Sequence, residues 1–161
     1  WSADPDIAGG WLLYGYGSHE VDQILWLLDS PAVRVFAMGQ CNNPHWQDFD
    51  EITIQLRLGN GAIATQQHTL NCPFSAWDCI VIGTEIAMRI ETGALLLGDE
   101  RIEAPLQDGG GMREQLSEFA RAIAEGREPE ASGRSVRPTM VALEAAKLSL
   151  STGDVVDTGV M

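Results

Sequence analysis

The residues of this chain that are best suited to chemistry lie around His19. An imidazole can take up or release a proton near neutral pH, which makes histidine a frequent general acid or base. Tyr14 and Tyr16 precede His19 and offer hydroxyl groups on apolar rings. Gly15 and Gly17 permit backbone conformations that other residues avoid, and they let a ligand come close. The segment therefore predicts the edge of a ligand pocket.

An amphipathic helix positions His19. Apolar residues recur at the spacing of one helix face, at Val21, Ile24, Leu25 and Leu28. We expect Ser18 to cap this helix, and Glu20 and Asp22 to lie favourably in its positive first turn. A rigid helix start would then hold His19. A lone histidine in such a place is also commonly a surface or structural residue, so that alternative stays open.

Motifs at both ends of the chain follow a recognisable order. The first part contains Trp1-Ser2-Ala3-Asp4-Pro5, Gly9-Gly10, Gly17-Ser18-His19-x-x-Asp22 and Trp26-Leu27-Leu28. The last part contains Gly133, Ala142, Ala145-Ala146, Ser149, Gly153 and Val155. In this order and spacing they resemble the C-terminal domain of Gfo/Idh/MocA-type oxidoreductases, and the likeness extends over nearly the whole chain.

The resemblance implies roles for single residues and for a cofactor. His19 matches the family's substrate-contacting histidine, which shares in proton transfer with a lysine of a nucleotide-binding domain, and we expect Tyr16 beside it in the substrate site. NAD or NADP would be bound by that other domain, and we expect none on this chain alone. Many members have an aspartate where this chain has Gly15, so chemistry that needs that carboxylate is not expected. Asp22 matches the family's following aspartate, for which we expect a local hydrogen bond.

Family domains usually have a strand before the segment that matches Trp1 to Pro5. We therefore expect residues 1–161 to be a single domain and a fragment of a larger two-domain oxidoreductase. Its substrate would be an alcohol or carbonyl compound of sugar-like or polyol-like type, and the chain alone would be inactive. The alternative is a stand-alone, non-catalytic binding or scaffold module derived from the same domain.

Composition and charge argue against two classes of partner, membranes and nucleic acids. The chain has 161 residues and 45% hydrophobic residues, enough for one domain with a core. No apolar run approaches the roughly 20 residues that cross a bilayer, and no signal peptide is evident, so we expect a cytoplasmic protein without a membrane partner. The net charge of −13 opposes binding to phosphate backbones, so nucleic acid is not expected as a partner.

Three further motifs predict no site. Gly15-x-Gly17-x-x-Glu20 departs from the dinucleotide-binding pattern because Glu20 stands where a small residue is needed. The histidines at 19, 45 and 68 lack the spacing of a helical zinc site, so no metal is expected. The cysteines at 41, 72 and 79 are odd in number and lack paired spacing, so we expect reduced, mostly packed thiols and no disulfide.

The remaining elements are strands followed by helices. Strands are predicted at 33–41, 52–58, 63–69, 77–82, 87–90, 94–97 and 155–156, and helices at 112–126 and from about 135 to 153. The second of these helices should carry Val141, Ala145 and Leu148 inward. Because strands and helices do not alternate as βαβ units, we expect an α+β fold, a largely antiparallel open sheet with helices packed on one face.

The hairpin between the strands predicted at 52–58 and 63–69 decides which of their residues share a face of this sheet. Asn60-Gly61 predicts a two-residue type I′ turn that pairs Leu58 with Ile63. One face would then carry Thr53, Gln55 and Arg57 together with Ala64, Gln66 and His68. The family resemblance implies that such a face packs against a second subunit, so we expect a homodimer or higher oligomer built on it. His68 would lie at a solvated sheet edge or, alternatively, against a polar subunit or substrate surface.

Overall fold

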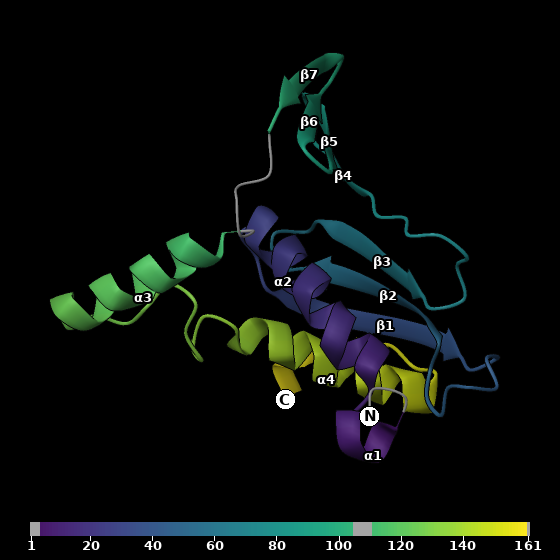
Figure 1. The fold of residues 1–161 in the computed structure, drawn as a ribbon. Coiled ribbons are helices and arrows are strands. Elements are labelled where there is room, and N and C mark those ends of the chain that lie inside the picture. Colours follow the sequence, from purple (N-terminus) through teal and green to yellow (C-terminus); the bar gives the residue numbers. More distant parts are fainter. Residues whose placement is uncertain (1–3, 105–110, 161) are drawn as a thin grey trace. The chain divides into compact units, whose positions relative to one another are not determined.

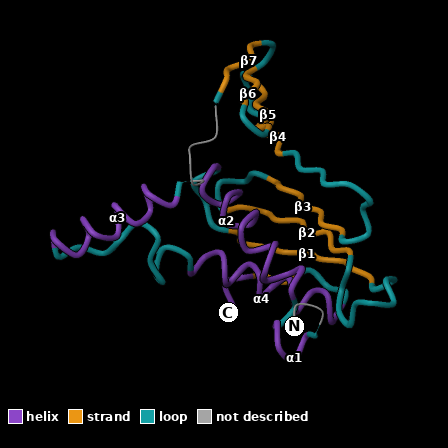
Figure 2. Tube along the Cα trace, viewed as in Figure 1, coloured by secondary structure: helices purple, strands orange, loops and turns teal. Residues whose placement is uncertain are grey.

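The structure is a computed structural model that describes residues 4–104 and 111–160. The chain divides into two compact units, one made of residues 1–71 and 131–161 and the other of residues 72–130 (Figure 1). Figure 2 shows how helices and strands follow one another along the trace. The α+β prediction is confirmed, because antiparallel sheets and separate helices make up the chain.

The first unit places two helices on one antiparallel sheet. Its elements are α1 (Pro5–Ala8), the π-helix η1 (Trp11–Tyr16), α2 (Gly17–Leu27), β1 (Ala32–Gln40), β2 (Glu51–Leu58), β3 (Ile63–Thr69), α4 (Arg137–Thr152), β8 (Val156–Asp157) and the 3-10 helix η2 (Thr158–Val160). The strand order is β3-β2-β1-β8. The helix α4 packs on β1 and on α2, while α2 also contacts β3. Helices therefore cover one face of this sheet, as predicted.

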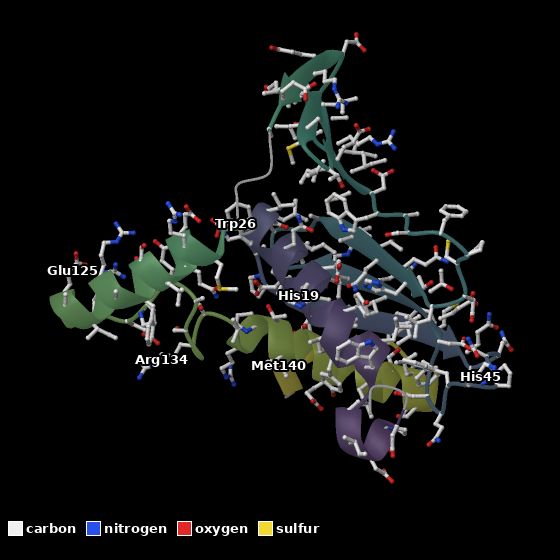
Figure 3. All side chains as sticks on the ribbon, viewed as in Figure 1. His19, Trp26, His45, Glu125, Arg134 and Met140 are labelled. Carbon is white, nitrogen blue, oxygen red and sulfur yellow. The ribbon has the colours of Figure 1, made fainter. Side chains whose placement is uncertain are left out.

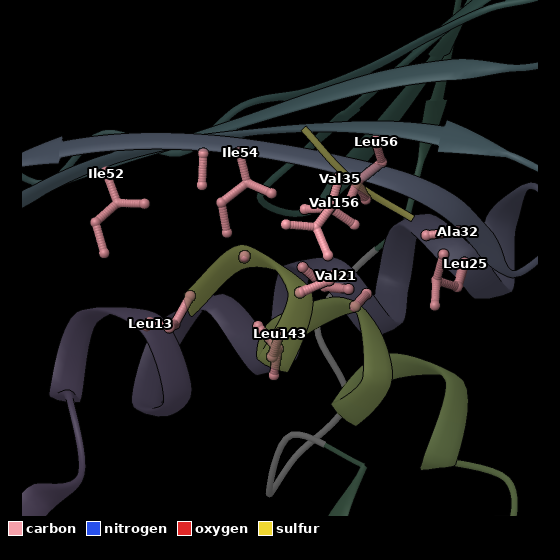
Figure 4. Close-up of a cluster of buried hydrophobic side chains, with 14 of the residues drawn as sticks. Leu13, Val21, Leu25, Ala32, Val35, Ile52, Ile54, Leu56, Leu143 and Val156 are labelled. Carbon is pink, nitrogen blue, oxygen red and sulfur yellow. The ribbon is translucent and has the colours of Figure 1, made fainter. Parts of the chain in front are cut away.

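The core lies between that face and the helices. Alternate residues of β2 point into it, so that Ile52, Ile54, Leu56 and Leu58 are each no more than 3% exposed (Figure 4). The helix α4 contributes mainly small buried residues, namely Thr139, Ala142, Leu143, Ala145, Ala146 and Ser149. Small side chains let a helix approach a strand closely. The prediction that Leu148 points inward is wrong, since this side chain is 44% exposed.

The hairpin between β2 and β3 is one residue out of the predicted register. Arg57 pairs with Ile63, and the Leu58 N–H donates to the Ala62 carbonyl (2.9 Å). The loop therefore has three residues and ends at Gly61, whose φ of +90° suits glycine. The Asn60 amide group donates to the Leu28 carbonyl (2.9 Å), a contact with the end of α2 that local turn rules do not include.

This shift of one residue exchanges the two faces of β3. Ala64, Gln66 and His68 pair with Leu56, Ile54 and Ile52, and therefore lie on the helix-covered face. The prediction that Gln66 and His68 face outward beside Gln55 is wrong. The open face instead carries Ile63, Thr65, Gln67 and Thr69 of β3.

The second unit contains a four-stranded antiparallel meander and one helix. The strands are β4 (Cys79–Ile82), β5 (Ala87–Glu91), β6 (Ala94–Leu97) and β7 (Glu100–Glu103), and the helix is α3 (Met112–Glu125). The strand β7 was not predicted because glutamates, which are depleted in strands, stand at both of its ends. The predicted end of α3 is confirmed, since Gly126 adopts the left-handed conformation with φ +64°.

Two further findings concern the whole described chain. Within residues 4–104 and 111–160, no helix is both long and apolar enough to span a membrane. All three cysteines are free thiols, and Cys41 and Cys72 are exposed while Cys79 is half-buried. The prediction of mostly packed thiols is therefore wrong for the first two.

Candidate functional site

The segment before His19 is a helix rather than a turn. The π-helix η1 continues directly into α2, and the Gly17 N–H donates to the Leu12 carbonyl. No side chain caps α2, so the prediction that Ser18 does so is wrong. Because the preceding turn already occupies the first N–H groups of α2, no free positive helix end faces Glu20. Short π-helices are frequent at functional sites.

The two glycines of this segment provide space, not unusual backbone angles. Neither has a positive φ, so the prediction of special conformations is wrong. A Cβ on Gly15 would lie 2.7 Å from the Trp11 ring, and one on Gly17 would lie 3.5 Å from the Gln66 amide nitrogen. The Trp11 ring in turn meets the Tyr16 ring edge-on, with centroids 5.8 Å apart. The glycines therefore allow close side-chain packing around η1.

His19 lies on the exposed side of α2, in its first turn (Figure 3). Among the described residues no hydrogen bond or ion pair of its ring is seen, so both ring nitrogens can bind a ligand. Asp22, one turn further, accepts a hydrogen bond from the buried Thr139 hydroxyl (2.6 Å). Asp22 thus ties α2 to α4, which is a longer-range contact than the local bond expected for it.

Tyr14 and Tyr16 lie in different surroundings. The Tyr14 hydroxyl donates to Glu144 Oε1 (2.7 Å), and the Lys147 ammonium lies 5.7 Å from the ring centroid. Partial burial and the adjacent Glu144 carboxylate raise the pKa of Tyr14. Tyr14 also lines a mostly apolar pocket of about 250 Å³ with Phe49. Of the two tyrosines, Tyr14 therefore belongs to a pocket beside α4.

Tyr16 borders a half-buried polar group that we call the Glu20–Gln66–His68 cluster. The Tyr16 ring, 46% exposed, lies 6.3 Å from the His68 ring between centroids. The Gln66 amide hydrogen-bonds His68 Nε2, and Glu20 Oε2 lies 3.6 Å from the same nitrogen. Burial lowers the pKa of His68, and the charge of Glu20 offsets part of this effect.

The sequence did not predict this cluster because its two β3 residues were assigned to the opposite face. The pattern of β3 is polar on both sides, so composition gives no preference between them. The signal that could have found it is the pair Asn60 and Ser30, because the Ser30 hydroxyl accepts from the Asn60 N–H (3.0 Å) and helps to fix the three-residue loop.

The sequence pattern of the family described as the GFO/IDH/MocA C-terminal domain matches residues 1–89. The chain belongs to the Gfo/Idh/MocA family. Its fold agrees with this, because many solved oxidoreductase structures are similar to it. A search among curated proteins found no match.

Three solved oxidoreductase structures illustrate the likeness in fold. A putative NADPH-dependent oxidoreductase from Desulfitobacterium hafniense has a TM-score of 0.86 and 21% identity, with 99% of this chain and 51% of that chain covered. An oxidoreductase from Agrobacterium radiobacter, in complex with NAD+, L-tartaric acid and magnesium, has a TM-score of 0.81 and 22% identity, with 90% of this chain and 48% of that chain covered. An aldose-aldose oxidoreductase from Caulobacter crescentus, complexed with glycerol, has a TM-score of 0.75 and 21% identity, with 88% of this chain and 45% of that chain covered. The chain thus spans about half the length of these three proteins.

The Gly15 to Glu20 segment of this Gfo/Idh/MocA domain does not fit the pyrophosphate of a nicotinamide dinucleotide. The one glycine pattern that approaches the binding motif, Gly15 to Glu20, lies inside a continuous helix whose Gly17 N–H is already bonded. A pyrophosphate needs free N–H groups at a helix start, and the Glu20 carboxylate would repel it. Among the described residues, no group of three or more metal-binding side chains is found either.

Proposed function

We propose that this chain is the substrate-binding and oligomerisation half of a cytoplasmic NAD(P)-dependent oxidoreductase, and that residues 1–161 form one domain of that larger protein. His19 would transfer a proton and Tyr16 would bind substrate. The observation that carries the proposal is the exposed His19 ring, three residues from the half-exposed Tyr16 on a helix of this family's domain. Residues three apart are neighbours on a helix surface, so one ligand can touch both.

The ligands of two similar proteins support a proposal for the substrate class. The Agrobacterium radiobacter structure holds L-tartaric acid and the Caulobacter crescentus structure holds glycerol, and both molecules carry hydroxyl groups. We therefore propose an alcohol or carbonyl substrate of sugar-like or polyol-like type. NAD or NADP would be held by another domain and would supply hydride chemistry.

In this proposal His19 handles the proton of the reaction. Oxidation of an alcohol to a carbonyl removes the hydroxyl proton, and an imidazole within hydrogen-bond reach accepts it; the reverse reaction returns it. Gly15 has no carboxylate to share this task, and Asp22 is occupied by Thr139. His19 is thus the group of this helix surface with a free proton acceptor next to Tyr16.

The test uses the full-length oxidoreductase that contains this domain. His19→Ala should lower kcat by roughly 10²-fold or more, because a positioned general acid or base contributes about that factor. Asp22→Asn is the matched control on the same helix, and it should reduce thermal stability while leaving kcat near the wild-type value. Steady-state rates that are unchanged in His19→Ala would contradict the proposal and leave His19 a surface residue.

A further inference from the structure

We propose that His68 is a positioning residue of the substrate site, which acts through the Glu20–Gln66–His68 cluster on Tyr16. The inference rests on the proposed function only in treating Tyr16 and His19 as substrate residues. Its starting point is the register of β3, which pairs His68 with the buried Ile52 and so directs the His68 side chain to the face that α2 covers.

Three elements meet at His68. Tyr16 ends η1, Glu20 lies one turn later in α2, and Gln66 and His68 are alternate residues of β3. Tyr16 and Glu20 are four residues apart and share one helix face. Gly17 lies between them and allows Gln66 to approach, since even a Cβ there would be only 3.5 Å from the amide nitrogen. The strand therefore supports the helix surface next to His19 through polar side chains.

Two acceptor atoms of the cluster lack a hydrogen-bond donor. Glu20 Oε2 and Gln66 Oε1 are buried without a partner in the described part of the chain, and Gln66 is only 6% exposed. Leaving a buried acceptor without a donor is unfavourable, so an arrangement that supplies a donor to either atom is stabilised. A change in the hydrogen bonds of the cluster can therefore stabilise it.

Protonation of His68 at Nε2 causes such a change. In neutral His68 this nitrogen accepts from the Gln66 amide, which requires the ring proton on Nδ1. Once protonated, Nε2 can donate to Glu20 Oε2, which already lies 3.6 Å away. The Gln66 amide N–H then loses Nε2 as its acceptor, so the Gln66 side chain has to rotate. A single proton thus changes the partners of all three side chains beneath Tyr16.

The surroundings fix the direction of the pH dependence. The charged group that faces His68 from α2 is Glu20, the titratable group from η1 is Tyr16, and β2 presents the apolar Ile52. Glu51 of β2 instead bonds Gln40 and Thr69. Burial holds the pKa of His68 below its usual 6.5 in spite of Glu20. The cluster is therefore in its neutral arrangement at neutral pH and changes under acid conditions.

The experiment follows the three histidines of this chain by NMR as the pH is lowered. His68 should titrate below 6.5, and Glu20→Gln should move its pKa lower still, because the favourable charge is removed. Tyr16 ring resonances should shift with the same midpoint in the wild type and lose that transition in His68→Gln. The exposed His45 is the matched control, so His45→Gln should leave both transitions unchanged.

Two outcomes would overturn the proposal. One is a titration midpoint of His68 at or above pH 6.5 that Glu20→Gln does not change. The other is a set of Tyr16 ring resonances that do not change when His68 is protonated. If His68→Gln fails to fold, the Glu20→Gln titration alone decides. In the full-length enzyme, His68→Gln should shift the acidic limb of the kcat/KM profile. The NMR result does not depend on turnover, so a failed His19 test leaves it separately interpretable.

Discussion

Gly15 stands at the position where the family resemblance implies an aspartate in many members. A Cβ at this position would stand 2.7 Å from the Trp11 ring, closer than packed atoms allow. We expect Gly15→Asp to reduce the free energy of unfolding by about 1–3 kcal/mol, because overpacking outweighs the better helix propensity of the new residue. Chemical denaturation of the isolated chain measures the change.

The control for that variant is Gly133→Asp. Gly133 has no positive φ and no atom within 4 Å of an added Cβ, so the free energy of unfolding should change by no more than about 0.5 kcal/mol. Adding Trp11→Ala to Gly15→Asp should restore part of the lost stability. A Gly15→Asp chain as stable as the wild type would show that the Trp11 ring moves aside without cost.

Single residues were predictable from sequence where a local pattern surrounds them. His19 stands out because glycines and tyrosines precede it and an apolar helix pattern follows. His68 does not, since its strand is polar on both faces and only the register decides whether it meets solvent or Glu20. That register depends on the contact between Asn60 and Leu28 at the end of α2, two residues that are 32 positions apart and meet only in the folded chain.

Regular elements were predicted well where their periodicity is long. The strand β2 alternates apolar and polar residues over its whole length, and α3 ends at a left-handed Gly126, so both follow from local chemistry. The π-helix η1 was not predicted, because Gly15 and Gly17 favour a turn in isolation. The packing of Leu12 and Leu13 into the core accompanies the helical path.

The link between α4 and β1 leads to a prediction about Ser149. Its side chain is fully buried, accepts from the Ala37 N–H (2.8 Å) and donates to the Asp154 carbonyl (2.6 Å). Ser149→Ala would leave that buried N–H unpaired, so the free energy of unfolding should fall by about 1–3 kcal/mol in urea denaturation. Ser151→Ala is the control, because the exposed Ser151 hydroxyl donates to the Leu148 carbonyl of its own helix. Equal effects of the two variants would contradict this role.

The open face of the sheet in the first unit is the surface on which we expect a second subunit to bind. It is mixed in character, with Met38 58% and Ile63 67% exposed beside polar residues of β2 and β3. The observed register places Gln67 opposite Thr53 on this face and removes Gln66 and His68 from it. Charges that test assembly must therefore be placed at Gln55 and Gln67 and not at the residues that the predicted register favoured.

We expect the chain to form a symmetric homodimer through this face, with a mass in light scattering of twice the 17.5 kDa of one chain. Gln55→Glu combined with Gln67→Glu should reduce the mass to that of one chain, since like charges would meet across the two-fold axis. Gln47→Glu with Gln115→Glu adds the same charge at exposed positions elsewhere and should leave the dimer intact. A wild-type mass of one chain at all concentrations would refute the dimer. A dimer that survives the first pair would place the contact on another surface, because two adjacent carboxylates on this face could not remain buried against their copies.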